Sequence, residues 1–491
     1  MRGKILGILS VLILLCLFLS MATAEHWYEP LSSKFLKLDN IMNLLSRLSL
    51  YGILGIGVAF VIITGGIDLS IGSLVCLSGV LLSILLNVSY EAESTFAVKQ
   101  ITATQQLIET TAAAGEIPSD SIVRFTGGIG SGVVFTIAEE VSPGVLRVEE
   151  IPPRDEPEGE LTLAVPVRSF DVETLTAEIS ETAAKAGDQL QIFLPNGAVS
   201  VQTIVSVSAD SGSLRLQLEQ DPGKKYHTGS YAAVLRRDQF MPIPLAVLCV
   251  LAITATVGLT HGLLITRLKL QPFVVTLCGL LMYRGISRWL TGDNPAGFGE
   301  LQEVLGPVAS GRLPVLLRGD EVLFGIPIPF FLLLGLATAA SVFLTRTIWG
   351  RYLLALGRSE EAARFSGINT QRVTILAYVI CSVMAGISGM LFAIEFSSIS
   401  PSSFGNSFEL YAIAAAVLGG CSLRGGEGSI PGVVIGTAVM MVLYNLIMLM
   451  RIPQSLEYTI IGAVILLGVL GDELVRRAAA GQRLRQDRNR N

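Results

Sequence analysis

Long apolar runs separated by short polar segments occupy most of the chain. A helix needs about 20 mostly apolar residues to cross a bilayer. Ten runs approach that length, at residues 4–23, 44–63, 71–88, 243–265, 272–290, 327–345, 372–395, 408–422, 430–449 and 456–474. The third and eighth runs are short and flanked by glycine, as broken or re-entrant helices are. The pattern predicts a polytopic α-helical membrane protein with about ten spanning helices and both chain ends on one side.

The pattern changes between the third and fourth runs, where residues 89–240 form an insert of domain size. Short β-prone stretches separated by turn residues recur there, at 133–137, 145–151, 161–167, 189–193, 199–207, 214–218 and 231–235. Residues 171–186 have apolar side chains at helical spacing, and residues 96–114 could extend the third span as a helix. We therefore predict a compact, β-rich domain with one or two helices.

Composition supports this division of the chain. Of the 491 residues, 51% are hydrophobic and 15% are charged, whereas about a quarter of the residues are charged in soluble domains. This excludes a soluble globular enzyme, a disordered chain and a nucleic-acid-binding protein. Residues 89–238 contain 22 acidic and 11 basic residues, against 40 and 35 in the whole chain. The insert is therefore strongly acidic, and the remainder has a charge of +6.

Basic residues in the short loops predict the orientation, because positive charge collects on the cytoplasmic side. With the N-terminus inside, every cytoplasmic loop is basic, and the outside segments are mixed or acidic. The predicted divisions are spans 1–3 (residues 1–88), an extracytoplasmic insert (89–240), spans 4–10 (241–475) with a polar loop at 346–371, and a basic cytoplasmic tail (476–491).

The first run has two interpretations. Arg2 and Lys4 precede it and Ala22-Thr23-Ala24 follows it, as in a secretory signal peptide. The alternative, which we favour, is an uncleaved spanning helix with its basic end in the cytoplasm. The six cysteines lie in or beside apolar runs without metal-ligand spacing, so we expect neither a metal site nor a disulfide in the insert.

A polar, glycine-rich segment at residues 65–73 joins the second and third runs. Glycine permits a break in a helix, and short polar side chains can cap the next one. A charged aspartate is costly inside a bilayer, so we expect it at the cytoplasmic interface or in a protein-lined break. The segment is either a translocation gate or a capped turn, and its candidate residues are Gly65, Gly66, Asp68, Ser70, Gly72 and Ser73.

A second polar segment follows the sixth run. Two glutamates at its start and an arginine near its end predict a short helix that ends at a glycine. Such a helix could dock on a cytosolic partner, although a solvated loop helix is the commoner explanation. The candidate residues are Glu360, Glu361, Ala362, Ala363, Arg364, Ser366, Gly367 and Asn369.

A third segment, residues 409–429, combines small residues with a glycine-rich turn. Small residues allow helices to pack closely in lipid. No Walker A pattern follows the turn or occurs elsewhere in the sequence, so any ATP hydrolysis would occur on another chain. The candidate helix-packing residues are Gly419, Gly420, Gly425, Gly426 and Gly428.

These three segments, in this order, resemble the motifs of the membrane subunit of ABC sugar importers, the ribose, xylose and galactoside-type permeases of the branched-chain-amino-acid-permease-like superfamily. Residues 267–277 also match the family's usual link between spans, and the likeness covers about residues 35–88 and 241–475. Two departures concern polar positions: Tyr411 replaces a common acidic residue, and His261 a common asparagine.

The resemblance implies a non-enzymatic transport subunit in the cell inner membrane that binds no cofactor itself. Residues 360–369 would form the coupling helix on a cytoplasmic ATPase subunit, which would hold ATP and Mg²⁺. Asp68 and its glycines would line the translocation region. Two permease copies would pair beneath an extracytoplasmic solute-binding protein that delivers a small sugar.

Several alternatives stay open. The solute could be a branched-chain amino acid or a nucleoside, or the chain could be a secondary transporter or a membrane-anchored receptor. A secondary transporter would need buried ionisable residues, which are scarce in the middle of the spans. The insert could contact a partner such as a solute-binding protein, but we favour a shielding or spacing role, because its residues form no recognisable site.

Overall fold

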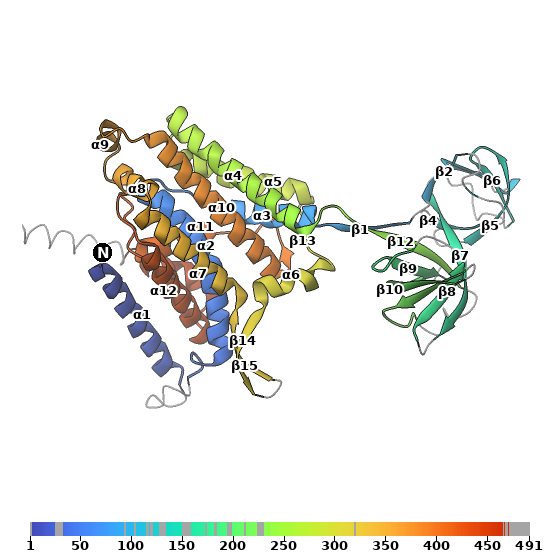
Figure 1. Ribbon diagram of the computed structural model, residues 1–491, viewed down its shortest axis with the longest axis horizontal. Coiled ribbons are helices and arrows are strands. Elements are labelled where there is room, and N and C mark those ends of the chain that lie inside the picture. Colours follow the sequence, from blue (N-terminus) through green and yellow to red (C-terminus); the bar gives the residue numbers. More distant parts are fainter. Residues whose placement is uncertain are drawn as a thin grey trace, which may run out of the picture. The chain divides into compact units, whose positions relative to one another are not determined.

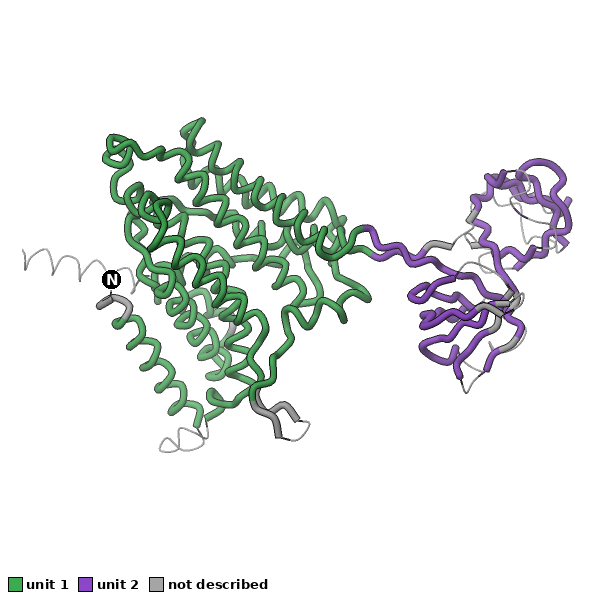
Figure 2. The backbone as a smooth tube through the Cα atoms, in the orientation of Figure 1, with its two compact units in different colours: residues 1–87, 241–491 green, residues 88–240 purple. Residues whose placement is uncertain are grey.

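The structure is a computed structural model, and its chain divides into two compact units. One comprises residues 1–87 and 241–491 and the other residues 88–240 (Figure 2). We call them the helical unit and the barrel unit and describe each separately. The described residues are 2–24, 33–92, 95–102, 105–113, 117, 121–126, 134–149, 159–171, 174–180, 184–193, 199–210, 213–222, 230–318, 321–464, 466 and 470.

The helical unit contains twelve described α-helices (Figure 1). They are α1 (Arg2–Ala22), α2 (Leu38–Ile63), α3 (Ile71–Leu85), α4 (Ile243–Arg267), α5 (Pro272–Thr291), α6 (Leu301–Ser310), α7 (Ile328–Arg346), α8 (Ile348–Arg358), α9 (Glu360–Phe365), α10 (Thr370–Phe396), α11 (Phe408–Leu418) and α12 (Ile430–Leu449). A 3₁₀ turn, η4 (Gln454–Leu456), follows, and residues 457–464 are helical. The rest of the predicted tenth span, except residues 466 and 470, and the tail lie outside the described residues.

Six of these helices, α2, α4, α5, α7, α10 and α12, are long and apolar enough to cross a membrane. Three further apolar helices are shorter, namely the described part of α1, α3 and α11. The predicted third and eighth runs are shorter still as helices, because α3 ends at Leu85 and α11 at Leu418. These helices account for the predicted apolar runs from the first to the ninth.

Helix α10 packs against α2, α3 and α4 at the centre of the unit. Glycines allow the closest approaches: a Cβ on Gly258 of α4 would lie 2.6 Å from the Tyr378 carbonyl oxygen, and one on Gly262 would lie 2.6 Å from Ile375 Cα. A later residue of α4 thus contacts an earlier residue of α10, so the two helices are antiparallel. The start of α4 therefore lies at the opposite end of the unit from the start of α10, which directly follows α9.

Two small hairpin-like pairings complete this unit. Strand β13 (Ala296–Gly297) pairs with β16 (Ser398–Ile399), and β14 (Arg312–Arg318) pairs with β15 (Glu321–Pro327). The first pairing connects the segment after α5 with the end of α10. Both pairings lie in the connections between helices.

The described residues of the barrel unit form twelve antiparallel strands. They are β1 (Val88–Ala92), β2 (Thr95–Thr102), β3 (Leu107–Thr110), β4 (Ile122–Thr126), β5 (Val134–Ser142), β6 (Val145–Val148), β7 (Gly159–Asp171), β8 (Thr176–Ser180), β9 (Gln189–Phe193), β10 (Val199–Asp210), β11 (Ser213–Leu218) and β12 (Tyr231–Gln239). Strands β5, β6, β7, β9, β10, β11 and β12 coincide with the seven predicted stretches.

The strand pairings form two closed barrels with the same connectivity. The first has the cyclic order β2-β3-β6-β5-β4-β7. The second has the order β7-β8-β11-β10-β9-β12. If the six strands of each barrel are numbered along the chain, both barrels have the cyclic order 1-2-5-4-3-6. The long strand β7 belongs to both, as the sixth strand of the first barrel and the first strand of the second. The barrel unit is thus a structural duplication, with a separate apolar core in each barrel.

Two predictions for this unit are wrong. Residues 96–114 contain strands β2 and β3 rather than a helical extension, and residues 171–186 contain β8 rather than a helix. In β8 the buried residues are Ala177 and Ile179, which is the two-residue period of a strand. Leu175 has a left-handed backbone (φ 54°) in the turn before β8, so the apparent helical spacing was coincidental.

Candidate functional site

The polar segment at 65–73 forms a break between α2 and α3. Gly65 has φ +82°, which favours glycine and turns the chain out of α2. Asp68 is completely buried, and its Oδ1 accepts hydrogen bonds from the Ser70 N–H (2.9 Å) and hydroxyl (2.7 Å). The side chains of Ser70 and Ser73 do not cap α3, so Asp68 alone of these three satisfies a backbone N–H by its side chain. We call residues 64–70 the Asp68 break.

Polar side chains from α4, α5 and α10 surround the Asp68 break. The Tyr283 hydroxyl and His261 Nε2 are 2.8 Å apart in a hydrogen bond. The Thr276 hydroxyl donates to the Ile67 carbonyl at 3.3 Å. The His261 ring also packs edge-to-face against the Tyr378 ring of α10, with 6.4 Å between the ring centroids. We call Asp68, His261, Thr276, Tyr283 and Tyr378, together with the buried Ser73 of α3 and Ser382 of α10, the buried polar cluster.

Several polar atoms of the cluster lack a hydrogen-bond partner among the described residues. A buried polar atom left unpaired costs about 1–3 kcal/mol. Such atoms can bind water or the hydroxyl groups of a solute when the surrounding helices separate. The unpaired atoms are Asp68 Oδ2, Ser73 Oγ, His261 Nδ1, Tyr378 Oη and Ser382 Oγ.

Sequence reasoning identified Asp68, Ser73 and the departure at His261, but not the roles of Thr276, Tyr283, Tyr378 and Ser382. A hydroxyl group inside an apolar run was the available signal. Serine and threonine hydroxyls are common in membrane helices, where they bond to their own backbone, and the large apolar ring of a tyrosine fits an apolar run. The signal could therefore not single out these four residues.

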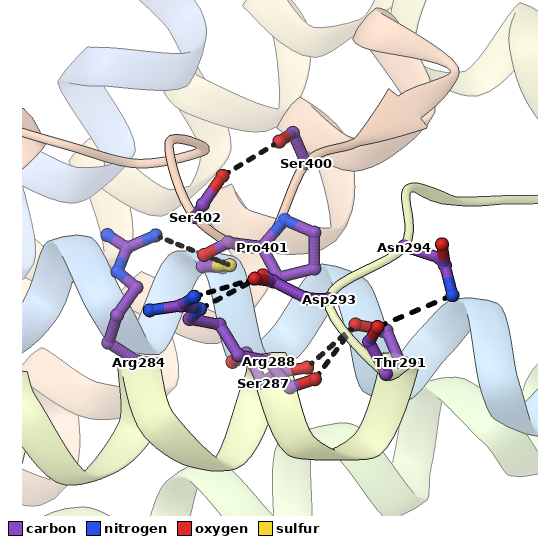
Figure 3. A network of polar contacts seen from close by, with 11 residues as sticks. Arg284, Ser287, Arg288, Thr291, Asp293, Asn294, Ser400, Pro401 and Ser402 are labelled. Atoms are coloured by element: carbon purple, nitrogen blue, oxygen red, sulfur yellow. Dashed lines mark hydrogen bonds and ion pairs between the residues drawn. The ribbon is translucent and has the colours of Figure 1, made fainter.

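The first turn of α3, directly after the Asp68 break, meets the loop before α11 and the first turn of α11. A Cβ on Gly72 would lie 2.1 Å from Glu409 Oε2 and 2.5 Å from the Gly405 carbonyl oxygen. Arg284 of α5 donates to the Pro401 carbonyl oxygen at 3.0 Å (Figure 3). It also donates to the Phe404 carbonyl oxygen and thereby holds the same loop. Gly72 thus serves close packing at this position.

One turn further along α5, Arg288 forms a bidentate ion pair with Asp293, with N–O distances of 2.9 and 2.6 Å (Figure 3). The guanidinium group lowers the pKa of the Asp293 carboxyl. Both side chains are about half exposed. The pair orders the turn at the end of α5 without forming part of the buried polar cluster.

The second polar segment contains α9, bounded on both sides by caps. Ser359 Oγ accepts from the Ala362 N–H at 3.2 Å, and Glu360 and Glu361 occupy the first turn. Arg364 lies in the last turn, Gly367 has φ +81°, and Asn369 Oδ1 accepts from the Arg372 N–H at the start of α10. Gly367 and Asn369 thus end one helix and begin the next.

Most side chains of this segment are exposed, whereas Ala363 is buried. Phe365 is 84% exposed, which is unusual for an aromatic residue on a charged helix. Its role was not predicted, because an apolar residue in a helical segment is normally expected to pack inward. The segment therefore presents carboxylates, a guanidinium group and one aromatic ring on a single short helix.

The glycine-rich turn serves two contacts. At its start, α11 and α12 touch through their backbones: a Cβ on Gly419 would lie 2.6 Å from the Gly432 carbonyl oxygen. Gly428 packs against Ile63 and Cys421, with Ile63 Cγ1 2.6 Å from its Cβ position. Gly420, Gly425 and Gly426 all have positive φ, between +75° and +87°.

The second contact brings the three motifs together. The Gly426 N–H donates to the Ile63 carbonyl, the last of α2, at 2.8 Å. A Cβ on Gly357 of α8 would lie 1.9 Å from this carbonyl oxygen, and one on Gly425 would lie 2.9 Å from the Gly65 nitrogen. We call Ile63, Gly65, Gly357, Gly425 and Gly426 the glycine junction.

No group of three or more His, Cys, Asp or Glu side chains that could hold a metal ion occurs in the part of the chain that the structure describes. The described polar segments form helix breaks, caps and close backbone contacts.

Comparison with known proteins identifies the family. The family described as branched-chain amino acid transport system / permease component matches residues 223–469, half of the chain. The chain belongs to this permease family. The match begins near the end of the barrel unit, so α1 to α3 and most of that unit lie outside it.

Individual relatives of this permease are sugar transport proteins. It is 35% identical to the ribose import permease protein RbsC of Escherichia coli K12 over 229 residues, which are 46% of this chain and 68% of RbsC. It is 31% identical to the xylose transport system permease protein XylH of the same strain over 285 residues, 48% of this chain and 72% of XylH. RbsC of Bacillus subtilis 168 is 34% identical over 212 residues, 43% and 62% of the two chains.

No solved structure matches the permease significantly. The resemblance to sugar-importer permeases is nevertheless confirmed by the family and by these relatives. Together with the six long apolar helices, it establishes a polytopic helical membrane protein with a transport role.

Proposed function

We propose that the chain is the transmembrane permease subunit of an ATP-binding-cassette importer. It would move a monosaccharide or related small polar solute into the cell, while separate cytoplasmic subunits bind and hydrolyse ATP. The observation that carries this proposal is α9, a short, capped and exposed helix between two spans of a permease-family chain.

The proposed topology follows from the positions of α9 and α4. If α9 faces the cytoplasm, the opposite end of the helical unit, where α3 ends and α4 begins, faces outward. The barrel unit would then lie outside, on the periplasmic or extracellular side of the inner membrane. The ten spans with both ends cytoplasmic, including an uncleaved α1, complete this arrangement.

The proposed mechanism uses alternating access. Closure of two ATPase subunits would move α9 of two paired permease copies, and the helices around the Asp68 break would separate. Gly65, Gly66 and Ser70 would shape the gate, and the unpaired atoms of the buried polar cluster would meet the hydroxyl groups of the solute. A solute-binding protein would supply specificity from outside, so this chain needs neither a catalytic residue nor a cofactor.

Charge reversal on α9 tests the proposal. The full chain is co-expressed with a candidate ATPase and binding protein, and co-purification and ATP-dependent uptake of labelled sugar into vesicles are measured. Glu361→Arg should abolish both, because α9 would lose its acidic first turn at the contact. Phe365→Ala should weaken co-purification, as aromatic anchors often cost more than 1 kcal/mol when truncated.

A matched control is Glu303→Arg, another first-turn glutamate but on α6. It should leave assembly and uptake intact. Normal co-purification of Glu361→Arg would contradict the α9 assignment, and uptake by the purified chain without any ATPase would contradict the importer and support a secondary transporter.

The family description itself favours a second candidate, a branched-chain amino acid as the solute. Competition of labelled ribose or xylose uptake by unlabelled leucine distinguishes the two. If leucine at equal concentration competes with the labelled sugar, a branched-chain amino acid replaces the sugar as the proposed solute.

A further inference from the structure

The glycine junction lies between the two elements to which the proposed function assigns docking and gating. Gly357 precedes Ser359, the cap of α9, by two residues, and Gly65 precedes Asp68 by three. Residues far apart in sequence thus bring the base of α9 against the base of the Asp68 break. Gly425 and Gly426 occupy the position between them.

The contacts in the junction join backbone to backbone. The Cβ position of Gly357 lies 1.9 Å from the Ile63 oxygen and 2.3 Å from the Gly426 nitrogen. The Cβ position of Gly425 lies 2.7 Å from the Gly357 oxygen and 2.9 Å from the Gly65 nitrogen. At Gly357 and Gly425 the contacts are between backbone atoms, so a displacement of one segment must displace the other or break the contact.

The Asp68 break also contacts α10, next to the buried polar cluster. Gly66 lies against the Tyr378 side chain, because a Cβ on Gly66 would be 2.7 Å from the Tyr378 hydroxyl oxygen. Tyr378 belongs to the buried polar cluster and its hydroxyl has no partner among the described residues. A shift of Ile63 and Gly65 would therefore change the surroundings of the Asp68 carboxylate directly.

We propose that the glycine junction is the mechanical link through which α9 and the Asp68 break move together, with Gly357, Gly425 and Gly426 as its positioning residues. This inference rests on the proposed function of α9. It adds the route by which an ATPase contact reaches the gate and names residues that touch neither ATPase nor solute.

Two glycines of the same turn provide a matched experiment. Gly425 and Gly420 have nearly the same backbone conformation (φ +83° and +87°), so alanine strains both equally. Among the described residues other than its chain neighbours, the only atom within 4 Å of the Gly420 Cβ position is Ile8 Cδ1, at 3.7 Å, whereas Gly425 faces two backbone segments. A difference in transport between the two alanine variants therefore reflects the contacts of the glycine junction and not backbone strain.

The full chain is assembled with its ATPase and binding protein in proteoliposomes, and three quantities are measured: co-purification of the ATPase, ATP hydrolysis, and solute transported per ATP. Gly425→Ala should retain co-purification and hydrolysis while solute per ATP falls about tenfold, a typical size for coupling between sites. Gly420→Ala should stay close to wild type.

A second measurement needs no variant, in case Gly425→Ala fails to fold. In the wild-type complex, a non-hydrolysable ATP analogue should change backbone hydrogen exchange at residues 64–70 as well as at α9. A change at α9 alone would overturn the proposed link.

The outcomes separate the two proposals. If the wild-type chain binds no ATPase or shows no ATP-dependent uptake, the proposed function fails. If the wild type is coupled but Gly425→Ala transports as much solute per ATP as Gly420→Ala, only the junction fails, and α10 becomes the remaining connection between α9 and Tyr378.

Discussion

The helices of the helical unit approach one another where side chains are absent, whereas the strands of the barrel unit close around side chains. Gly258 and Gly425 place backbone against backbone, while Phe135 and Ile179 fill the two barrel interiors. The helical unit also buries several polar atoms that lack a partner among the described residues, whereas the barrel unit buries one such atom, Arg124 Nε. The barrel unit therefore has two apolar cores, whereas the helical unit has helices in backbone contact around a buried polar cluster.

The largest expected effect in this comparison is a cavity in a barrel core. Phe135 is 1% exposed in the first barrel, and Phe135→Ala should destabilise the barrel unit by about 3–5 kcal/mol, the usual cost of truncating a buried phenylalanine. Phe240→Ala, at a position 69% exposed in the same unit, is the matched control. Limited proteolysis and thermal unfolding of the full chain measure the difference.

If the barrel unit only shields or spaces the permease, Phe135→Ala should leave solute uptake unchanged at temperatures where the helical unit is folded. Loss of uptake in parallel with the barrel transition would show that transport depends on the barrel unit, as a contact for a solute-binding protein would require.

A smaller effect is expected from filling a helix contact. Gly258→Leu would place Cβ 2.6 Å from α10 backbone atoms, and overpacking of this kind typically costs about 1–3 kcal/mol. Gly285→Leu on α5 is the control, because no atom of another described segment lies within 4 Å of its Cβ position. The melting temperature of the detergent-purified chain should fall only for Gly258→Leu; equal melting temperatures would show that α4 and α10 separate readily.

The same contrast explains what the sequence could predict. Alternating apolar residues such as Leu190 and Ile192 predict a strand even when its partner strand is unknown. The length of the apolar runs predicts the membrane helices. The wrong helices at 96–114 and 171–186 arose where a short run fits both periods. The duplicated barrels and the glycine junction depend on partners distant in sequence: Gly425 is visible as a turn residue, but nothing local connects it to Gly357 or Gly65.

The smallest effects should come from exposed ion pairs, which occur in both units with similar exposure. Arg288–Asp293 in the helical unit and Arg147–Glu139 in the barrel unit both have N–O distances of 2.6 Å and side chains about half exposed. Exposed pairs of this kind contribute little, because water and salt screen them. Asp293→Asn and Glu139→Gln should both leave the melting temperature at pH 7 nearly unchanged.

The Asp293 pair nevertheless has a defined pH dependence. Because Arg288 lowers the pKa of Asp293 below the ordinary value of 3.8, its small stabilisation is present above that value and is lost as the pH falls through the lowered pKa. Asp293→Asn should therefore remove a slight acid sensitivity below about pH 4 and change nothing at neutral pH. A large loss of stability at pH 7 would mean that the turn after α5 is as sensitive as the buried contacts, and the contrast between buried backbone contacts and exposed pairs would fail there.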